Sequence, residues 1–335
     1  MTQWYIQDDH PQAVSLLCDL RATFEQRTGG LTTLERLTRE QGSAPAGFLC
    51  GDDLRAEMIA QRTGLQRVTQ EKGFSGDHPT INTPWDILEH LPTLLKEDLE
   101  RAEPIDGSCN SQTFGDHRID IHSSATLFPT TVLDASNGAI RIEADVVIRP
   151  NAVIIGPCWI GAGSTVYEAG IIKANTSIGP CCKVSGEVGG TIIQGYTNKC
   201  HDGHLGDSVI GEWVNFGAGT TNSNVLNTYG EVVVMDLDGI RHKTGRNYVG
   251  CFVGDHVKFA INTRIMTGSM IGTGAMIATS TPAPSPTPRF AWLTDGDSST
   301  YRTSKFLDVA RTVMARRDKE LDAATEAVIQ RLADS

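Results

Sequence analysis

The stretch from residue 198 to residue 207, NKCHDGHLGD, contains two histidines and a lysine close together. Histidine titrates near neutral pH, so an imidazole held in a crevice can take a proton from an attacking amine. The turn at 217–219 that follows offers backbone amides, which can hold the oxygen of a reacting carbonyl. These residue types are typical of acyl transfer to an amine, although histidine and asparagine in turns also occur for structural reasons alone.

A six-residue repeat must position these groups. Eight β-branched aliphatic residues follow one another at intervals of six without a slip: Ile142, Ile148, Ile154, Ile160, Val166, Ile172, Ile178 and Val184. Small, polar or turn-forming residues lie between them, as in Gly161-Ala162-Gly163 and Gly179-Pro180. Each hexad predicts one short strand with its aliphatic side chain pointing inward, followed by a turn. The pattern indicates a parallel β-helix.

The six-residue step also occurs on both sides of this run. Residues that keep it there are Ile121, Leu127, Leu133, Ile210, Phe216, Val253, Phe259, Ile265, Ile271 and Ile277. Two interruptions separate the later segments, one over 189–206 with a loop-like 195–206, and one over 222–250. A stack of coils tolerates insertions, which loop out at its corners. Because loops on a rigid scaffold often carry function, we expect the function at these interruptions.

The N-terminal part, residues 1–106, predicts a small α/β domain. Polar residues in capping positions indicate helices near 31–37 and 53–59. Thr83 followed by proline is a good helix start, and we expect Pro92 to break that helix.

We assign the β-helix to residues 117–281. Residues 282–335 form a proline-rich linker and a C-terminal helix over 303–334, according to the apolar stripe of that segment. Because repeat arrays need caps, we expect this helix to cover the open end of the coil. The predicted fold class is therefore mainly β, with a small α/β domain before the coil and a helix after it.

Bulk composition narrows the function classes. The 335-residue chain carries a net charge of −11, which disfavours a general nucleic-acid-binding or anionic-membrane surface. It contains no apolar run long enough to cross a membrane, and its first residues, MTQW, do not begin a signal peptide. The eight cysteines include no C-x-x-C pair. We therefore expect reduced thiols, no metal site and a cytoplasmic location.

Residues 195–230 resemble the acetyltransferase half of the bifunctional UDP-N-acetylglucosamine pyrophosphorylase/glucosamine-1-phosphate N-acetyltransferases, in a divergent bacterial branch. The motifs that carry the resemblance are Asn198-Lys199-x-His201-x-Gly203, Leu205-Gly206-Asp207 and Gly217-Ala218-Gly219-Thr220. The resemblance covers 121–280 well and 313–317 more loosely. It implies a left-handed β-helix of triangular section, assembled as a homotrimer, with acetyl-CoA bound in a groove between subunits.

The same resemblance implies roles for single residues. His201 stands five residues before Gly206 and matches the general base, which would deprotonate the amine of an amino-sugar phosphate such as glucosamine-1-phosphate. Residues matched to contacts with the sugar, or considered for its phosphate, are Lys199, Asn215, Asn224, Lys243 and Arg246. Residues assigned to contacts with CoA are Ala218, Gly219, Ile261 and Ala278.

The sequence also departs from the family. His204 stands where the better-known branch has a tyrosine, and Ile261 replaces a serine that usually touches CoA. The segments 20–32 and 84–86 are similar to landmarks of the uridylyltransferase half. However, the glycine-rich phosphate loop and a pair of acids for Mg²⁺ are missing. We interpret residues 1–106 as a shortened nucleotidyltransferase-like domain without pyrophosphorylase activity.

Other functions stay open. The chain could be an acetyltransferase for a different amine, a non-catalytic trimeric scaffold, or a protein that retains nucleotidyltransferase activity. A γ-type carbonic anhydrase is a further alternative, because that class is also a hexapeptide-repeat trimer with zinc on three histidines. The candidate ligands for that alternative are His201, His204 and one of His117, His122 or His256.

Overall fold

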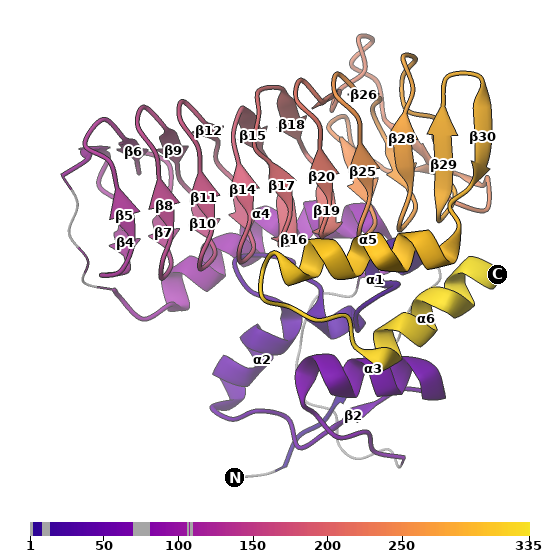
Figure 1. Ribbon diagram of the computed structural model, residues 1–335. Coiled ribbons are helices and arrows are strands. Elements are labelled where there is room, and N and C mark those ends of the chain that lie inside the picture. The colour runs from indigo at the N-terminus through magenta and orange to yellow at the C-terminus, as the bar shows by residue number, and fades with distance from the viewer. Residues whose placement is uncertain (1–2, 9–13, 70–80, 106, 108–109) are drawn as a thin grey trace.

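The computed structural model describes residues 3–8, 14–69, 81–105, 107 and 110–335. A parallel β-helix makes up most of it (Figure 1), which confirms the fold that the repeat predicted. Each complete turn of the coil adds one strand to each of three faces, and strands on one face pair in parallel with the turns before and after.

The first face contains eight strands. They are β4 (Ile119–Ile121), β7 (Ile140–Ile142), β10 (Cys158–Ile160), β13 (Thr176–Ile178), β16 (Ile192–Gly195), β19 (Val209–Glu212), β24 (Cys251–Val253) and β27 (Ser269–Ile271). The second face contains ten, of which the last, β30, pairs antiparallel with β29. They are β5 (Thr126–Leu127), β8 (Val147–Ile148), β11 (Thr165–Val166), β14 (Lys183–Val184), β17 (Asn198–Lys199), β20 (Asn215–Phe216), β25 (Lys258–Phe259), β28 (Met276–Ala278), β29 (Ala291–Thr294) and β30 (Asp297–Thr300).

The third face is shorter, because the chain leaves it after six strands. They are β3 (Gln112–Phe114), β6 (Val132–Asp134), β9 (Val153–Ile155), β12 (Ile171–Ile172), β15 (Glu187–Gly189) and β18 (His204–Gly206). Beyond β18 a separate parallel pair follows, β21 (Thr221–Asn222) with β26 (Arg264–Ile265).

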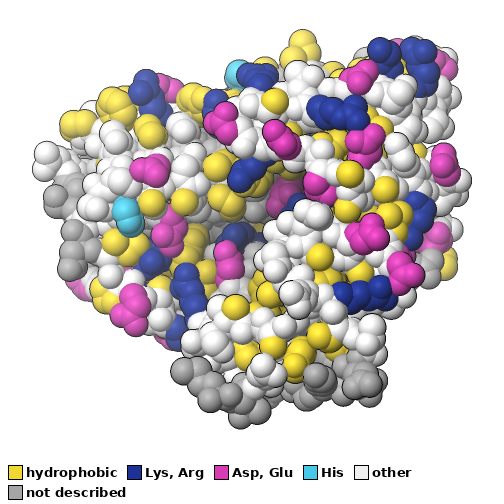
Figure 2. Space-filling view, turned by 60° about the horizontal axis from the view of Figure 1, so that its bottom comes forward, with side chains coloured by type: hydrophobic (Ala, Val, Ile, Leu, Met, Phe, Trp, Pro, Cys, Tyr) yellow, Lys and Arg dark blue, Asp and Glu magenta, His cyan; other side chains and the backbone are white. Residues whose placement is uncertain are grey.

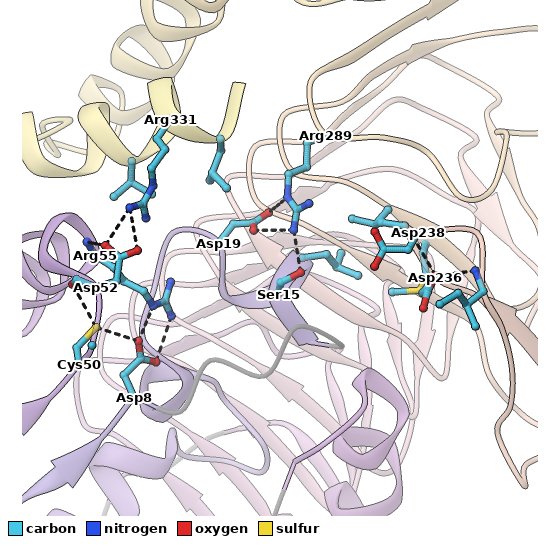
Figure 3. A pocket seen from close by; sticks show the side chains of 17 residues that line it. Asp8, Ser15, Asp19, Cys50, Asp52, Arg55, Asp236, Asp238, Arg289 and Arg331 are labelled. Atoms are coloured by element: carbon cyan, nitrogen blue, oxygen red, sulfur yellow. Dashed lines mark hydrogen bonds and ion pairs between the residues drawn. The ribbon is translucent and has the colours of Figure 1, made fainter. Parts of the chain in front are cut away.

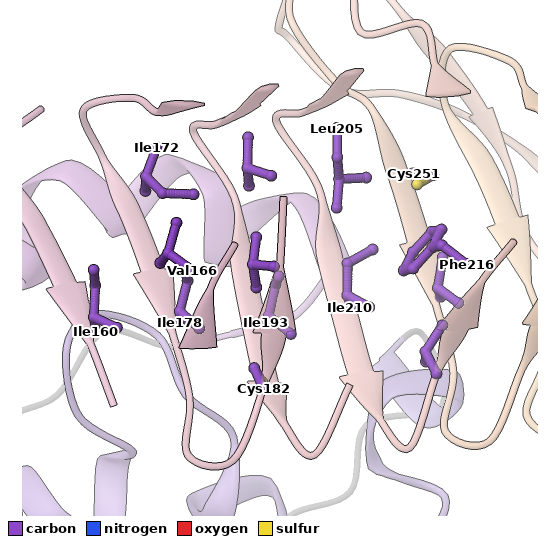
Figure 4. Packing of buried hydrophobic residues seen from close by; sticks show 14 of the residues in the cluster. Ile160, Val166, Ile172, Ile178, Cys182, Ile193, Leu205, Ile210, Phe216 and Cys251 are labelled. Atoms are coloured by element: carbon purple, nitrogen blue, oxygen red, sulfur yellow. The ribbon is translucent and has the colours of Figure 1, made fainter. Parts of the chain in front are cut away.

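The predicted inward-facing residues form the core of the coil. All eight aliphatics from Ile142 to Val184 are completely buried. Figure 4 shows how side chains from successive turns, such as Ile160 and Ile178, lie along the axis of the coil in one buried cluster. Burial of such a side chain contributes about 1.5–3 kcal/mol, so this column of residues is the main source of the coil's stability.

The two interruptions behave differently. The first, over 189–206, was expected to contain a loop, but it stays in the coil and forms β16, β17 and β18. Its glycines let the corners absorb uneven spacing, while Ile193 and Leu205 continue to point inward. The second does leave the coil: residues 222–250 carry the antiparallel hairpin of β22 (Val233–Met235) and β23 (Arg241–Lys243). Val234 and Val249 pack it against Phe252 on the outside of the first face.

The N-terminal part combines short strands with helices. Strands β1 (Ile6–Gln7) and β2 (Phe48–Leu49) pair in parallel. The other elements of this part are helices. These are α1 (Ser15–Cys18), η2 (Thr23–Glu25), α2 (Thr33–Gln41), α3 (Asp53–Thr63) and α4 (Pro84–Arg101). The prediction that Pro92 breaks α4 is wrong. Leucines on both sides of it, among them Leu91 and Leu95, are buried in one cluster, and that burial outweighs the missing N–H of an exposed proline.

The landmarks within 20–32, on which the resemblance to the uridylyltransferase half rested, pack against the coil. Arg21 forms ion pairs with Asp255 and Glu212, which lie at the ends of coil strands. The backbone of Arg27 exchanges hydrogen bonds with the Gln194 side chain, at 2.9 and 3.3 Å. A Cβ on Gly30 would lie 2.3 Å from the Trp159 ring, so only glycine allows this close approach. These landmarks therefore attach the N-terminal part to the coil.

The C-terminal part consists of two helices, where one was predicted. Helix α5 (Thr303–Ala315) ends just before Arg316, and α6 (Ala323–Asp334) begins after Asp322 caps it. Helix α5 lies lengthwise along the coil and α6 packs on α3 (Figure 1), so neither covers the end of the coil. The β29–β30 hairpin lies there instead. The proline-rich segment before it continues the coil, since Thr287 bridges to Ile271.

Among the described residues, the structure contains no helix with the length and apolar character needed to span a membrane.

Candidate active site

One corner of the coil, between the second and third faces, carries most of the residues assigned to catalysis and to CoA. His201 lies there, exposed, in the turn between β17 and β18. The next turn of the coil places Ala218 and Gly219 at the same corner, since a Cβ on Gly203 would lie 2.2 Å from the carbonyl oxygen of Thr220. The turn after that adds Ile261, whose neighbour Asn262 donates its N–H to the Ala218 carbonyl at 2.7 Å.

This corner offers hydrogen-bond donors beside an imidazole. Within the described residues, the N–H groups of Ala218 and Gly219 donate no hydrogen bond, so they are available to an incoming oxygen. Ile261 is 69% exposed and gives the corner an apolar edge. Ala278 ends β28, on the second face one turn beyond Ile261. These small and apolar residues fit an extended ligand such as acetyl-CoA, which needs close approach to the backbone and apolar contact.

Lys199 was considered as a ligand for the sugar phosphate, and the structure does not support that role. Its side chain is 2% exposed. Its ammonium donates to three backbone carbonyls, those of Ser185 at 3.3 Å, His201 at 2.6 Å and Asp202 at 3.0 Å. An ammonium has three protons, so these carbonyls satisfy it completely. Lys199 therefore faces the inside of the coil and leaves no donor for an external phosphate.

A second polar cluster surrounds Gly206 on the third face. The Asn224 amide donates to the Asp207 carboxylate at 2.6 Å. The His204 ring lies over Gly206, where an added Cβ would be 2.5 Å from its Cε1 atom and 2.7 Å from the Asn224 amide. His204 Nδ1 lies 3.2 Å from the carbonyl oxygen of Asn222, to which it can donate, and Nε2 lies 3.9 Å from the Glu187 carboxylate. Asn224 and His204 thus form one polar surface.

Charges around this cluster are balanced by neighbours. Burial raises the pKa of Asp207, while the hydrogen bond from Asn224 and the charge of Arg246 oppose that rise. Arg246 itself forms an ion pair with Glu89 of α4. Of the three cations considered for the sugar phosphate, Arg246 is therefore the one placed at the cluster. Lys243 is exposed on β23, opposite Val233.

Asn215 lies apart from Asn224. It occupies the outward position of β20, because its neighbour Phe216 points into the core. Asn215 pairs in register with Asn198 on β17, and the side-chain amide oxygen (Oδ1) of Asn198 accepts a hydrogen bond from the Arg317 guanidinium at 3.0 Å. Sequence reasoning missed this contact of the C-terminal segment with the second face. No local pattern gives it, since 119 residues separate the two partners.

One cleft among the described residues lies away from both clusters. A cleft of about 730 Å³ opens between the N-terminal part, the β22–β23 hairpin and α6, and contains none of the predicted site residues. Figure 3 shows that its charged side chains pair with one another, as Asp52 does with Arg331 and Asp19 with Arg289. On the face drawn in Figure 2, acidic and basic side chains are interspersed.

Over the described residues, no three side chains of histidine, cysteine, aspartate or glutamate gather closely enough to hold a metal ion. Within this part of the chain, His201 and His204 thus have no third ligand.

The fold and its repeat define a hexapeptide-repeat protein. Its sequence relatives are bifunctional sugar nucleotidylyltransferase/acetyltransferases, which confirms the resemblance drawn from the motifs. The bifunctional protein GlmU of Methanococcus maripaludis (strain S2) is 35% identical over 250 residues, which are 68% of this chain and 60% of that protein. The bifunctional sugar-1-phosphate nucleotidylyltransferase/acetyltransferase of Sulfurisphaera tokodaii is 37% identical over 150 residues, 41% of this chain and 36% of that protein. The chain thus matches only about one third to three fifths of the length of these relatives.

No model of a known protein family matches the sequence. Among solved structures, the acetyltransferase domain of PglB from Neisseria gonorrhoeae in complex with acetyl coenzyme A aligns with a TM-score of 0.24 and 13% identity, over 66% of this chain and 96% of that one.

Proposed function

We propose that this chain is an acetyl-CoA-dependent N-acetyltransferase that acts on an amino sugar, with glucosamine-1-phosphate or a similar sugar phosphate as the acceptor. The observation that carries the proposal is the corner where His201, the free amides of Ala218 and Gly219, and the exposed Ile261 stack on successive turns. The relatives whose names include acetyltransferase support the reaction class.

Each of these residues has its own role in the proposed reaction. The imidazole of His201 removes a proton from the amine as the amine attacks the thioester carbonyl, which acetyl-CoA supplies when bound. The N–H groups of Ala218 or Gly219 stabilise the oxyanion that forms on that carbonyl. The tetrahedral intermediate then collapses, and CoA leaves as its thiolate.

The acceptor is proposed to lie between this corner and the cluster of His204, Asn224 and Arg246. The imidazole and amide can bind sugar hydroxyls, and the guanidinium can attract the phosphate. Glu89 competes for Arg246, so a bound phosphate would have to share or replace that ion pair.

We further propose that the active unit is a homotrimer. Both clusters lie on exposed surface of a single chain, and large apolar side chains are exposed on the segments that follow β20. These side chains are Tyr229, Tyr248, Ile261 and Met266. A subunit interface would bury them and supply the opposite wall of the groove.

A thiol-release assay tests the function. Acetyl-CoA is offered with glucosamine-1-phosphate, other amino-sugar phosphates, nucleotide-linked amino sugars and amino acids as separate acceptors. CoA release that depends on one acceptor supports the proposal and identifies the amine. Release with none of them, in a preparation that sediments as a trimer, favours the scaffold alternative. Zinc retained after purification together with CO₂ hydration would favour the carbonic anhydrase.

A further inference from the structure

A charged residue interrupts the apolar column beneath the second face. Strand pairing places Val166 beside Val184 and Val184 beside Lys199, and Phe216 pairs with Phe259 further along. The neighbours of Lys199 on both sides are buried aliphatic or aromatic side chains, whereas Lys199 ends in an ammonium. Hexad positions of this kind strongly favour apolar residues, because a buried charge is costly unless it is fully hydrogen-bonded.

The methylene groups and the ammonium of the Lys199 side chain have different surroundings. Its methylene groups take the place of an aliphatic residue between Val184 and Phe216. Its head reaches the corner, where two of its three acceptors are the carbonyls of His201 and Asp202. The third acceptor, the carbonyl of Ser185, belongs to the preceding turn of the coil. One ammonium thus ties the turn that carries His201 to the turn before it.

The preceding turn of the coil also restricts the position of the turn that carries His201. A Cβ on Gly186 would lie 3.0 Å from the His201 carbonyl and 2.6 Å from the Gly203 carbonyl, so backbone already lies close on that side. Burial lowers the pKa of Lys199 to about 8, and the carboxylate of Asp202 opposes this shift. Burial of the Lys199 ammonium therefore costs free energy. Two of its three hydrogen bonds go to the turn that carries His201.

We propose that Lys199 is a positioning residue, which holds the His201 turn from inside the coil and thereby fixes the direction of the His201 imidazole. This inference rests on the proposed acetyltransferase function. A general base must lie within hydrogen-bond reach of the proton that it removes, so a small displacement of its backbone slows the reaction. The two anchored carbonyls, those of His201 and of the next residue Asp202, restrict such displacement.

The test is a double-mutant cycle of Lys199→Met and His201→Ala, with Lys183→Met as the matched control. Methionine keeps the apolar stem and removes the ammonium, and Lys183 is the outward-facing lysine of the neighbouring strand β14. We expect Lys199→Met to lower kcat about 10- to 100-fold, with the KM for acetyl-CoA changed by less than about twofold. In the His201→Ala background, the same substitution should lower kcat no further, because the residue acts through His201. Lys183→Met should leave kcat unchanged.

An undiminished kcat in Lys199→Met, or equal losses in the two backgrounds, would overturn the inference. If Lys199→Met does not fold, Lys199→Gln keeps an amide donor and should give an intermediate kcat under the same cycle. Independent of turnover, the rate at which diethyl pyrocarbonate modifies His201, read by mass spectrometry, should change in Lys199→Met, while that of the exposed His117 should not. Equal rates at His201 in both proteins count against the proposal. Absence of turnover in the wild-type protein would instead contradict the proposed function, and this modification assay would still test Lys199.

Discussion

Arg289, which follows the proline-rich segment, binds the carboxylate of Asp19 at the end of α1 with two hydrogen bonds, of 2.8 and 2.9 Å. Asp19 is almost completely buried and also accepts a hydrogen bond from Thr273 on the coil, at 2.7 Å. This arrangement joins the beginning and the end of the chain across 270 residues. The N-terminal part is therefore held against the coil by specific polar contacts as well as by apolar burial.

Arg289→Ala should destabilise the protein by roughly 3 kcal/mol, because it leaves the Asp19 carboxylate buried with only a hydroxyl as partner. Urea unfolding followed by circular dichroism measures the change. Arg311→Ala is the control, since its partner Glu326 and Arg311 itself are both partly exposed, and its loss should cost less than about 1 kcal/mol. Equal effects of the two substitutions would contradict a structural role for the Asp19 contact.

His201→Ala should reduce kcat by about two to four orders of magnitude, because the imidazole is the proposed general base. The proposed trimer should persist in this variant, since the side chain is exposed and contributes nothing to the core. Steady-state thiol release and sedimentation velocity measure the two outcomes. Turnover equal to that of the wild-type protein would remove His201 from the mechanism.

His204→Phe should raise the KM for the acceptor about tenfold, since it removes a polar nitrogen next to Asn224 and keeps an aromatic ring over Gly206. The KM for acetyl-CoA should change little, because the residues assigned to CoA lie at the other cluster. His204→Tyr should restore part of the acceptor affinity through its hydroxyl. If His204→Phe instead changes only the KM for acetyl-CoA, the assignment of the two clusters is reversed.

Acid should weaken the protein through His256. Burial among Trp213, Phe306 and the coil lowers the pKa of His256 to about 3, against 6.5 for an ordinary histidine, and the charge of Lys258 acts in the same direction. The carboxylate of Glu212 opposes this shift, whereas Arg21 and Arg62 add to it. Between pH 6.5 and 3 the unfolded chain binds a proton that the folded protein does not, so His256 makes stability fall as the pH falls below 6.5.

The slope from this one residue is up to about 1.4 kcal/mol per pH unit. His256→Phe should remove that part of the slope, which thermal unfolding at pH 7.0, 6.0 and 5.0 measures. His117→Gln, a change at an exposed histidine, should keep the wild-type slope. An unchanged slope in His256→Phe would show that His256 does not titrate differently in the folded and unfolded states.

Much of the coil followed from local sequence. In a strand, neighbouring side chains point to opposite sides, so the six-residue step from Ile142 to Val184 determined which residues point inward. Turn residues between them determined where the chain bends. The corner that carries His201 did not follow in this way, because the six-residue step breaks over 189–206 and a loop was expected there, whereas the structure keeps the segment in the coil. The departure of 222–250 from the coil also followed, as a break in the repeat, but its antiparallel hairpin was not predicted.

The prediction that Lys199 binds the sugar phosphate was wrong. Its sequence position beside His201 suggested a surface cation, yet its place in the repeat is an inward one that the altered spacing after Val184 concealed. The partners of Asn198, Asp19 and Arg21 could not be read from the sequence either, since each lies more than a hundred residues away. The sequence by itself determined the coil and its corners, because strand direction and turn formation depend on near neighbours. Only the tertiary structure decided which charges are buried and paired, because those contacts depend on how distant segments dock on the coil.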